Sequence, residues 1–497
     1  MSPLYAGNTC LPIDDPLLAT CKIGGYPVYV VNAETVWDVQ AAVNFARNAN
    51  IRLVVKNTGH DFNGKSSGSH SLSIRTQNMK DIKYISNYNK NGYKGKAFKV
   101  AAGVSGAELY AVAKTKNVVV VGGEGMTVGW GGGYIQGGGH SPLSSILGMA
   151  ADSVLSFDVV LANGRYVTAD KSQNKDLFWA LRGGGGSTYG VVVATTVRAH
   201  ADFPVAVSKF SFLPSTRDLA KYASGDMSND DFWAVVKVYF EQFKDHADEG
   251  IYTYFGAYPM GDGSYLFNML PFFAPKLTVA DVNRLLKPVF DKAAELNMPI
   301  TPDTRQFTNF YDAWQFGFPK ETIGGWDGQF GSRLFPRENW EDKTKRDATF
   351  DVWRELTNRP TGYVLGFNMA PKAVIGSESD TSFTPAWRNT LLHSITGVSW
   401  GREIRDTDPE FVRAEQKKFT EVDMKKWRDV SPNAGAYLGE ADLNEPNRQF
   451  SFWGPYYARL YEIKQQLDPR GVFYAENAVA SEDWTTGVSR LDRLCPL

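Results

Sequence analysis

Cysteine is scarce in this chain of 497 residues, which holds only three. Cys10 and Cys21 lie near one end and Cys495 near the other, and none of them has the spacing of metal ligands. A short Cys10–Cys21 disulfide is expected if the chain matures in an oxidising compartment, and two free thiols are the alternative. The six histidines are scattered as well, so no bound metal is expected.

A surplus of either charge is also missing. The 53 Lys and Arg residues nearly balance the 54 Asp and Glu residues, which argues against nucleic acid or a membrane surface as a partner. No apolar run approaches the roughly 18 residues that a membrane-spanning helix needs. The first ten residues lack the basic and apolar segments of a signal peptide. We expect a secreted protein whose signal peptide has been removed, with a cytoplasmic protein as the alternative.

The glycine clusters of the chain lack three common motifs. Neither glycine cluster, 122–139 or 183–190, matches G-x-x-x-x-G-K-[ST], so these clusters are not expected to form a P-loop. Neither cluster contains a G-x-S-x-G elbow, which lowers the expectation of an α/β-hydrolase. The clusters do not fit G-x-G-x-x-G in frame after the first expected strand, so a Rossmann NAD site is not expected. A nucleotide-bearing cofactor would therefore have to be held by other loops.

Glycine, by contrast, is concentrated in the stretch Gly122–Gly139, where it makes up ten of 18 residues. Glycine inside a helix or strand costs roughly 0.5–1 kcal/mol relative to alanine, so such a cluster needs a compensating role. A linker is the alternative, but serine and proline are absent, and larger residues such as Trp130 and Tyr134 interrupt the run. Backbone N–H groups of a glycine-rich turn can surround an anion, usually a phosphate. We interpret the stretch as a cradle for a nucleotide or dinucleotide.

The N-terminal part alternates between strand and helix patterns. Residues 27–31 and 51–55 are expected to be strands that flank a helix over 33–50, as in a βαβ unit. A polar turn follows at 56–68 and contains a histidine. A second glycine cluster at 183–186 precedes another apolar strand, and two such clusters suggest one extended ligand lying across both.

From about residue 203 onward, aromatic residues become denser and charged helical stretches occur. Strands of an antiparallel sheet are expected at 210–213, 252–258 and 363–368. Amphipathic helices are expected at 278–295 and 413–428. This change in composition indicates a second domain that covers the first.

Four segments together resemble FAD-linked oxidases. They are NTGHD at 57–61 with the NGKSSG that follows, the glycine-rich stretch that continues into GGGYIQGGGHSPLSS, DLFWALRGGGGSTYGVV at 176–192, and SFWGPYYARLYEIKQQLDPRGVFYAENAV at 451–479. More closely, the chain resembles the berberine bridge enzyme-like branch of the vanillyl-alcohol oxidase/p-cresol methylhydroxylase (PCMH) superfamily, in fungal proteins of isoamyl alcohol oxidase type. The match covers both ends of the chain, and the middle third is only loosely diagnostic.

The resemblance implies an α+β flavoprotein of two domains. A PCMH-type FAD-binding domain would occupy residues 1–205, with its core at about 25–203. A substrate-binding domain, an antiparallel sheet with helices, would occupy 206–430, and the C-terminal segment 431–497 would return to the FAD domain. We expect a monomer that binds a small-molecule substrate and dioxygen.

The resemblance also implies which residues hold the FAD. His60 matches the histidine that is covalently joined to the flavin through its 8α-methyl carbon. Asn57, Thr58, Gly59 and Asp61 match the turn whose backbone binds the pyrophosphate. The other positions that match cofactor-binding residues are Ser66, Gly125, Thr127, Val128, Gly129, Gly132, Gly133, Tyr134, Gly138, His140, Gly190, Val192, Tyr474 and Asn477.

Two of these positions refine the expected chemistry. Many relatives form a second covalent bond from a cysteine in a Gly-x-Cys-Pro-Thr-Val-Gly motif, and Gly125 stands at that place here. We therefore expect a single covalent bond, from His60. Val128 matches a position where a small side chain in relatives gives dioxygen access to the flavin, which favours an oxidase over a dehydrogenase.

The catalytic segment of the family corresponds to Tyr437–Asp442, with Glu440 at the place of the catalytic tyrosine. A carboxylate in an apolar, aromatic cavity can have its pKa raised toward 7 and accept the substrate proton. The alternative is a structural ion pair of Glu440 with Arg448 or Arg459. Tyr437 and Tyr456 are further candidates for catalytic residues.

The expected function is hydride transfer from an alcohol, sugar or natural-product C–H to the flavin, with dioxygen as acceptor and hydrogen peroxide as product. One alternative is a redox-neutral isomerase or cyclase that keeps the flavin. Another is a flavin-carrying binding protein without turnover.

Overall fold

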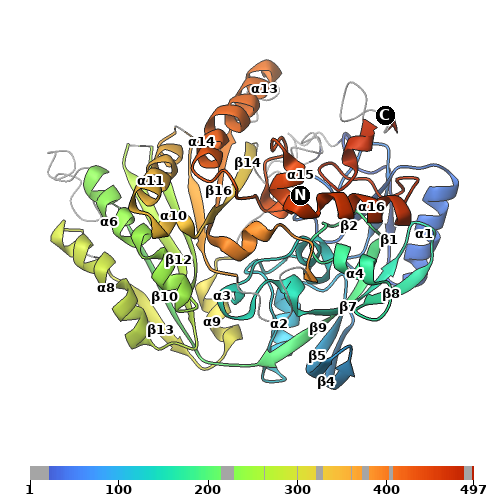
Figure 1. Ribbon diagram of the computed structural model, residues 1–497, viewed down its shortest axis with the longest axis horizontal. Coiled ribbons are helices and arrows are strands. Elements are labelled where there is room, and N and C mark those ends of the chain that lie inside the picture. Colours follow the sequence, from blue (N-terminus) through green and yellow to red (C-terminus); the bar gives the residue numbers. More distant parts are fainter. Residues whose placement is uncertain are drawn as a thin grey trace.

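The computed structural model describes residue 10 and residues 22–213, 229–261, 263–298, 300–320, 328–359, 361–371, 380–401, 407–485 and 495–496. These residues form two lobes that lie side by side (Figure 1). The N-terminal part and the C-terminal tail build the first lobe, and the middle of the chain builds the second. No helix among the described residues combines the length and the apolar character that crossing a bilayer requires.

The first lobe begins with a small parallel sheet. Its strands lie in the order β1 (Tyr29–Asn32), β3 (Leu72–Arg75) and β2 (Leu53–Lys56). Helix α1 (Val36–Asn48) connects β1 to β2, and a capping box of Thr35 and Asp38 begins it. The expected βαβ unit is present, but β3 pairs in parallel with both of its strands and separates them.

A larger antiparallel sheet completes the first lobe. It contains β4 (Ile82–Lys90), β5 (Tyr93–Ala101), β9 (Val191–Ala201), β7 (Val154–Val160) and β8 (Tyr166–Asp170) in that order, with β6 (Val118–Val119) also paired to β9. The expected turn at Asn163 and Gly164 joins β7 to β8, and Gly164 has a φ of +80°. Helices α2 (Gly106–Lys114) and α4 (Lys175–Ala180) pack against this sheet. Helix α3 (Ser144–Leu147) contacts the second lobe, where Ser145 donates to the carbonyl oxygen of Ile251 at 2.8 Å.

The glycine-rich stretch is a close-packed loop. A π-helical turn, Trp130–Tyr134, lies in its middle. Gly139 has a φ of +71°, and a Cβ there would lie 2.7 Å from the ring of Tyr134. The hydroxyl of Tyr134 donates to the carbonyl oxygen of His140 at 2.7 Å. This bond fixes the chain where it leaves the stretch.

The second lobe is built on a sheet of seven antiparallel strands. Their order is β13 (Asp303–Phe307), β10 (Val205–Phe212), β12 (Tyr265–Pro275), β11 (Tyr252–Pro259), β15 (Val364–Asn368), β16 (Thr390–Ser399) and β14 (Gly328–Pro336). The expected antiparallel sheet is thus confirmed. One face packs against the first lobe through Tyr252, Phe367 and Ile395, which belong to the core of that lobe.

Helices cover the other face of this sheet (Figure 1). These helices are α6 (Asn229–Glu241), α7 (Phe243–Asp248), α8 (Val279–Glu295), α10 (Glu338–Glu341), α11 (Lys343–Thr357), α13 (Pro409–Lys418) and α14 (Met424–Asp429). Helix α9 (Phe310–Gly317) instead packs into the core of the first lobe. The helix expected at 278–295 is confirmed as α8. The helix expected at 413–428 is confirmed as a helical segment, in which a π-helical turn, Phe419–Asp423, lies between α13 and α14.

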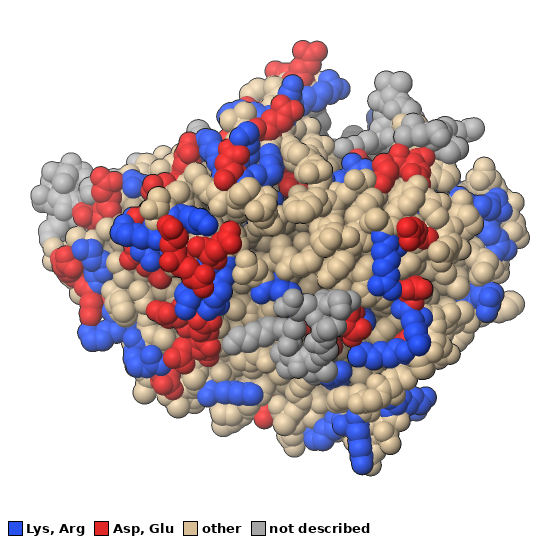
Figure 2. All heavy atoms as spheres, in the orientation of Figure 1, with Lys and Arg blue, Asp and Glu red and all other residues tan. Residues whose placement is uncertain are grey.

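Charges of both signs are interspersed on the surface of these helices (Figure 2). Asp347 of α11 lies 3.0 Å from Lys237 of α6. Arg346 lies 3.3 Å from Glu241. The visible face therefore has no large area of one sign over the second lobe.

The C-terminal tail packs onto the first lobe. It contains α15 (Arg448–Trp453), α16 (Tyr457–Leu467), β17 (Trp484–Thr485) and β18 (Cys495–Pro496). Lys464 of α16 is buried, pairs with Asp468 at 2.7 Å and donates to the carbonyl oxygens of Thr188 at 2.8 Å and Phe473 at 2.7 Å. These bonds tie the tail to the second glycine cluster.

Cys10 is disulfide-bonded. Its carbonyl oxygen accepts a hydrogen bond from the Tyr26 hydroxyl at 3.2 Å. Cys21, the partner that the sequence suggests, lies outside the described residues.

Candidate active site

The first lobe contains a cavity of about 1210 Å³, its open mouth included. The loop after β2, both glycine clusters and residues 437–440 form its wall. The predicted site residues that line it are Asn57, Thr58, Gly59, His60, Asp61, Ser66, Gly125, Val128, Gly129, Gly132, Gly133, Tyr134, His140, Gly190, Val192, Tyr437 and Glu440.

Two predicted residues of the glycine-rich region lie next to this wall rather than in it. Thr127 contacts the cavity residue His60, with its Oγ1 atom 2.8 Å from Nε2. Gly138 packs against the ring of Phe383, 3.3 Å from where a Cβ would be. Thr127 therefore belongs to the site, and Gly138 supports the loop from behind.

Three predicted residues of the tail do not line the cavity. The ring of Tyr456 packs edge-on against Trp179, with centroids 5.7 Å apart. Tyr474 lines a separate, smaller cavity. Asn477 is buried and donates to the carbonyl oxygen of Leu443 at 2.7 Å. Tyr456 and Asn477 thus have the contacts of packing residues, whereas Tyr474 lines a cavity that shares Lys65 with the larger one.

His60 is held in a turn that follows β2. Gly59, directly before it, has a φ of +95° in the left-handed region. Burial lowers the pKa of His60 to about 4. The imidazole is therefore neutral near pH 7. If Nε2 donates to Thr127, Nδ1 keeps a lone pair that can form a covalent bond.

Side chains of the same turn fix its shape. Oδ1 of Asp61 accepts the backbone N–H groups of Asn63 and Lys65, each at 2.9 Å. Oγ1 of Thr58 accepts the N–H of Gly129 at 3.0 Å. The second bond joins the turn to the glycine-rich stretch on the opposite side of the cavity.

The wall made by the glycine-rich stretch is largely bare backbone. A Cβ at Gly129 or Gly132 would lie 2.5 or 2.7 Å from the Asn57 side chain, whereas one at Gly133 would meet no atom within 4 Å. Oδ1 of Asn57 is buried and has no hydrogen-bond partner among the described residues. An open backbone wall beside an unsatisfied amide oxygen fits a large ligand rich in hydrogen-bonding groups. The residues present therefore fit an FAD.

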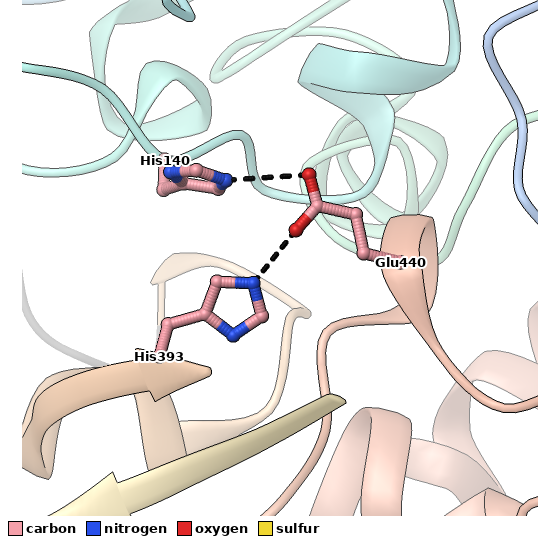
Figure 3. A group of neighbouring side chains, drawn as sticks. All are labelled: His140, His393 and Glu440. Carbon is pink, nitrogen blue, oxygen red and sulfur yellow. Dashed lines mark hydrogen bonds and ion pairs between the residues drawn. The ribbon is translucent and has the colours of Figure 1, made fainter. Parts of the chain in front are cut away.

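Three ionisable side chains converge at the edge of this cavity (Figure 3). Nε2 of His393, on β16, lies 2.7 Å from Oε2 of Glu440. Nε2 of His140 lies 3.5 Å from Oε1 of the same carboxylate. The Glu440 side chain is 18% exposed, His140 is 3% exposed and His393 is fully buried. His140 and Glu440 line the cavity, and His393 lies behind them.

One proton is enough to balance this cluster. Burial alone would raise the pKa of Glu440, but His140 and His393 outweigh it and lower the pKa to about 2. Burial alone would lower the pKa of His140, but Glu440 and then Glu124 raise it above 6.5. Burial keeps the pKa of His393 below 6.5. Glu440 is therefore ionised, and His140 binds a proton more readily than His393 does.

The expectation that the cavity raises the pKa of Glu440 toward 7 is wrong in direction, because two histidines from other elements face the carboxylate. The alternative ion pairs are wrong as well. Arg448 lies 3.8 Å from Glu482, and Arg459 lies 2.7 Å from Asp176.

Aromatic rings hold the two histidines in place. His140 stacks on Trp387, with centroids 5.9 Å apart, and His393 stacks on Phe367 at 5.5 Å. Tyr437 meets the ring of His140 edge-on at 5.6 Å. These contacts restrict the imidazoles to the orientations that face the carboxylate.

The cluster could also be viewed as a set of metal ligands, since its three ligand atoms lie within 4.8 Å of one another. However, the direct contacts of Glu440 with both histidines already balance its charge and satisfy its oxygens. We therefore assign the cluster to proton chemistry.

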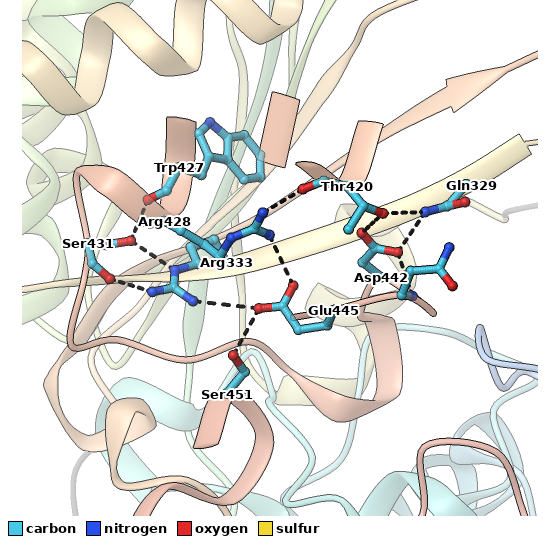
Figure 4. Close-up of polar contacts among 10 residues, drawn as sticks. Gln329, Arg333, Thr420, Trp427, Arg428, Ser431, Asp442, Glu445 and Ser451 are labelled. Carbon is cyan, nitrogen blue, oxygen red and sulfur yellow. Dashed lines mark hydrogen bonds and ion pairs between the residues drawn. The ribbon is translucent and has the colours of Figure 1, made fainter. Parts of the chain in front are cut away.

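The loop that carries this carboxylate is anchored to the second lobe by buried polar contacts (Figure 4). Asp442 accepts hydrogen bonds from Gln329 at 2.7 Å and from Thr420 at 2.6 Å. Glu445 lies 3.9 Å from Arg333, and both side chains are almost fully buried. The network places the loop that carries Glu440 relative to strand β14.

The residues that were not predicted from the sequence include three with polar side chains near the Glu440–His140 pair. They are His393, Tyr252, whose hydroxyl lies 3.3 Å from His140, and Glu124, which lines the cavity. His393 and Tyr252 lie on strands of the second lobe, so only the sheet brings them here. For Glu124 the sequence offered one signal, namely that it is a charged residue inside the glycine-rich stretch.

Comparison with known proteins identifies the family. Residues 27–170 match the family described as FAD binding domain, and residues 436–480 match the family described as berberine and berberine like. The FAD-linked oxidoreductase ZEB1 of Gibberella zeae is 35% identical over 501 residues, with 100% of this chain and 83% of that protein covered. The VAO-type flavoprotein oxidase VAO615 of Thermothelomyces thermophilus is 36% identical over 506 residues, with the same coverage.

A solved structure shows the same fold. The crystal structure of the VAO-type flavoprotein MtVAO615 from Myceliophthora thermophila C1 matches with a TM-score of 0.86 at 35% identity, covering 100% of this chain and 87% of that chain. The family and the two-domain fold expected from the sequence are confirmed. This chain belongs to the FAD-linked oxidoreductases of VAO type, in the berberine bridge enzyme-like branch.

Proposed function

We propose that this oxidoreductase is an oxidase, which takes a hydride from an alcohol, sugar or natural-product C–H and passes the electrons to dioxygen. The observation that carries the proposal is the pairing of Glu440 with His140 at the cavity that His60 also lines. Bound FAD would accept the hydride and return to its oxidised form by reaction with dioxygen, releasing hydrogen peroxide. The small side chain of Val128 in the cavity wall supports dioxygen access.

The substrate proton is taken by the Glu440–His140 pair rather than by Glu440 alone. A carboxyl group with a pKa of about 2 holds a proton poorly near neutral pH. His140, whose pKa is raised above 6.5, can hold it, while the carboxylate orients the ring and balances its charge. Tyr437 covers the pair with its ring.

His60 would form the single covalent bond to the flavin. Its neutral imidazole offers Nδ1 as a nucleophile while Thr127 contacts Nε2. Gly125 lines the same cavity and has no side chain that could form a second bond.

Anaerobic reduction across a panel of alcohols, oligosaccharides and alkaloid-like amines tests the proposal. A substrate should bleach the visible flavin band, and readmitted air should restore it with release of peroxide. Turnover without peroxide would favour the redox-neutral isomerase or cyclase. A flavin band that no compound bleaches would favour a binding protein.

We also propose that the protein works in an oxidising compartment and is secreted. The disulfide at Cys10 supports this, because cytosolic thiols are kept reduced. Finding Cys10 free in protein isolated from its natural source would contradict it.

A further inference from the structure

Glu124 is a second carboxylate in the wall of the cavity. Its Oε2 atom lies 3.4 Å from the hydroxyl of Tyr252. Its carbonyl oxygen accepts the indole N–H of Trp314 at 2.9 Å, which fixes this part of the loop from the second lobe. Neither Glu124 nor Tyr252 takes part in the function proposed above.

Tyr252 connects Glu124 to the proton-accepting pair. Its hydroxyl lies 3.3 Å from Nδ1 of His140, and the other ring nitrogen of His140 lies 3.5 Å from Glu440. The contacts thus run through both nitrogens of one imidazole. Tyr252 is fully buried and His140 is 3% exposed, so the two middle groups are shielded from solvent.

Only one assignment of donors and acceptors satisfies the hydrogen bonds between these four groups. A carboxylate only accepts, so Tyr252 donates to Glu124 and its oxygen accepts from Nδ1–H of His140. Nε2–H of His140 then donates to Glu440. Burial and the charge of Glu124 keep the pKa of Tyr252 well above 10, so its hydroxyl retains a proton. The hydroxyl of Tyr134 does not compete, because it donates to the carbonyl oxygen of His140.

We propose that Glu440, His140, Tyr252 and Glu124 form a proton relay that removes the substrate proton from the base, with Glu124 as its outer end. The inference rests on the proposed function. The Nδ1–H bond of His140 breaks as an O–H bond forms on Tyr252, and the original O–H bond of Tyr252 breaks as one forms on Glu124. One proton moves, and no electrons are exchanged.

The relay solves a problem of access. A substrate seated against Glu440 blocks the direct path from the carboxylate to the cavity. Glu124 is half-buried and reaches the cavity from the glycine-rich stretch, so it can release the proton there. His140 is then neutral again, and the Glu440–His140 pair can take up another proton.

Proton exchange at His140 tests the relay without any substrate. In holoenzyme with isotope-labelled histidine, NMR measures how fast the Nδ1–H proton exchanges with solvent. Tyr252→Phe removes only the hydroxyl and should slow this exchange about tenfold or more, in keeping with the loss of a positioned proton-transfer group. Glu124→Gln should slow it as well, and Glu124→Asp should restore part of the rate.

Tyr254→Phe is the matched control, because it removes a hydroxyl from the same strand, two positions from Tyr252, and should leave the exchange rate unchanged. Equal exchange rates in wild type, Tyr252→Phe and Glu124→Gln would overturn the relay. If Tyr252→Phe does not fold, the exchange rates in Glu124→Gln and Glu124→Asp test the relay instead. The result does not depend on the substrate panel, so the relay and the oxidase proposal can fail separately.

Discussion

Glu440 and His140 share one proton across the boundary between the C-terminal tail and the glycine-rich stretch. Each changes the pKa of the other, and His393 adds a second contact to the carboxylate. The family pattern pointed to Glu440 correctly as a cavity residue. It could not show the two histidines, and without them the direction of the pKa shift was mispredicted.

Replacing Glu440 with glutamine tests its role. Glu440→Gln keeps the size of the side chain but removes the charge that raises the pKa of His140. We expect flavin reduction by any substrate from the panel to slow by about 10²-fold or more. Stopped-flow absorbance under anaerobic conditions measures the rate. Glu462→Gln, on the exposed side of α16, is the control and should be neutral.

The pH dependence of the same step follows from His140. Below its pKa the Glu440–His140 pair already holds a proton and cannot accept another. Flavin reduction should therefore accelerate as the pH rises through a pKa above 6.5. In Glu440→Gln the remaining rate should titrate at lower pH, since the carboxylate no longer raises the pKa. A rate that falls as the pH rises through this range would contradict the assignment of the base.

The glycine-rich stretch is the element on which cofactor binding depends. Gly132→Ala would place a Cβ 2.7 Å from the Asn57 side chain, whereas Gly133→Ala would project into open space. We expect Gly132→Ala to lower the melting temperature and Gly133→Ala to leave the fold intact. If FAD covers this wall, Gly133→Ala should still reduce flavin content. Absorbance per mole of protein measures that content, and full loading in both variants would argue against the assigned wall.

Helices and strands with a strong hydrophobic periodicity could be predicted from the sequence. The breaks within helices and the pairing of distant strands could not. Helix α8 and the antiparallel strands β11 and β15 follow apolar patterns that local sequence reveals. The break at Phe419–Asp423 depends on a π-helical turn within a continuous amphipathic pattern. The site of His393 depends on the pairing of β15 with β16, which sets Phe367 beside it. Such long-range registers are not encoded in any single segment.

At the scale of the whole molecule, the buried network at Asp442 joins the loop that carries Glu440 to the second lobe. Burial raises the pKa of Asp442 from 3.8 to about 6. The folded protein therefore binds this proton more tightly than the unfolded chain. The resulting stability is fully present below about pH 4 and is lost as the pH rises through about 6, an effect of roughly 3 kcal/mol.

Asp442→Asn tests this linkage. The amide cannot ionise, so the melting temperature of the variant should fall less between pH 4 and pH 7 than that of the wild type. Glu445, whose pKa burial also raises, should retain its own share of the pH dependence. Identical pH profiles of the melting temperature in variant and wild type would show that Asp442 does not titrate in this range.

The covalent flavin at His60 is the central claim for the site as a whole, and peptide mass analysis tests it most directly. After denaturation and proteolysis, the peptide that contains His60 should carry the added mass of the flavin, and no second peptide should be attached to it. The same peptide from His60→Ala should be unmodified. An unmodified His60 peptide from yellow wild-type protein would contradict the account.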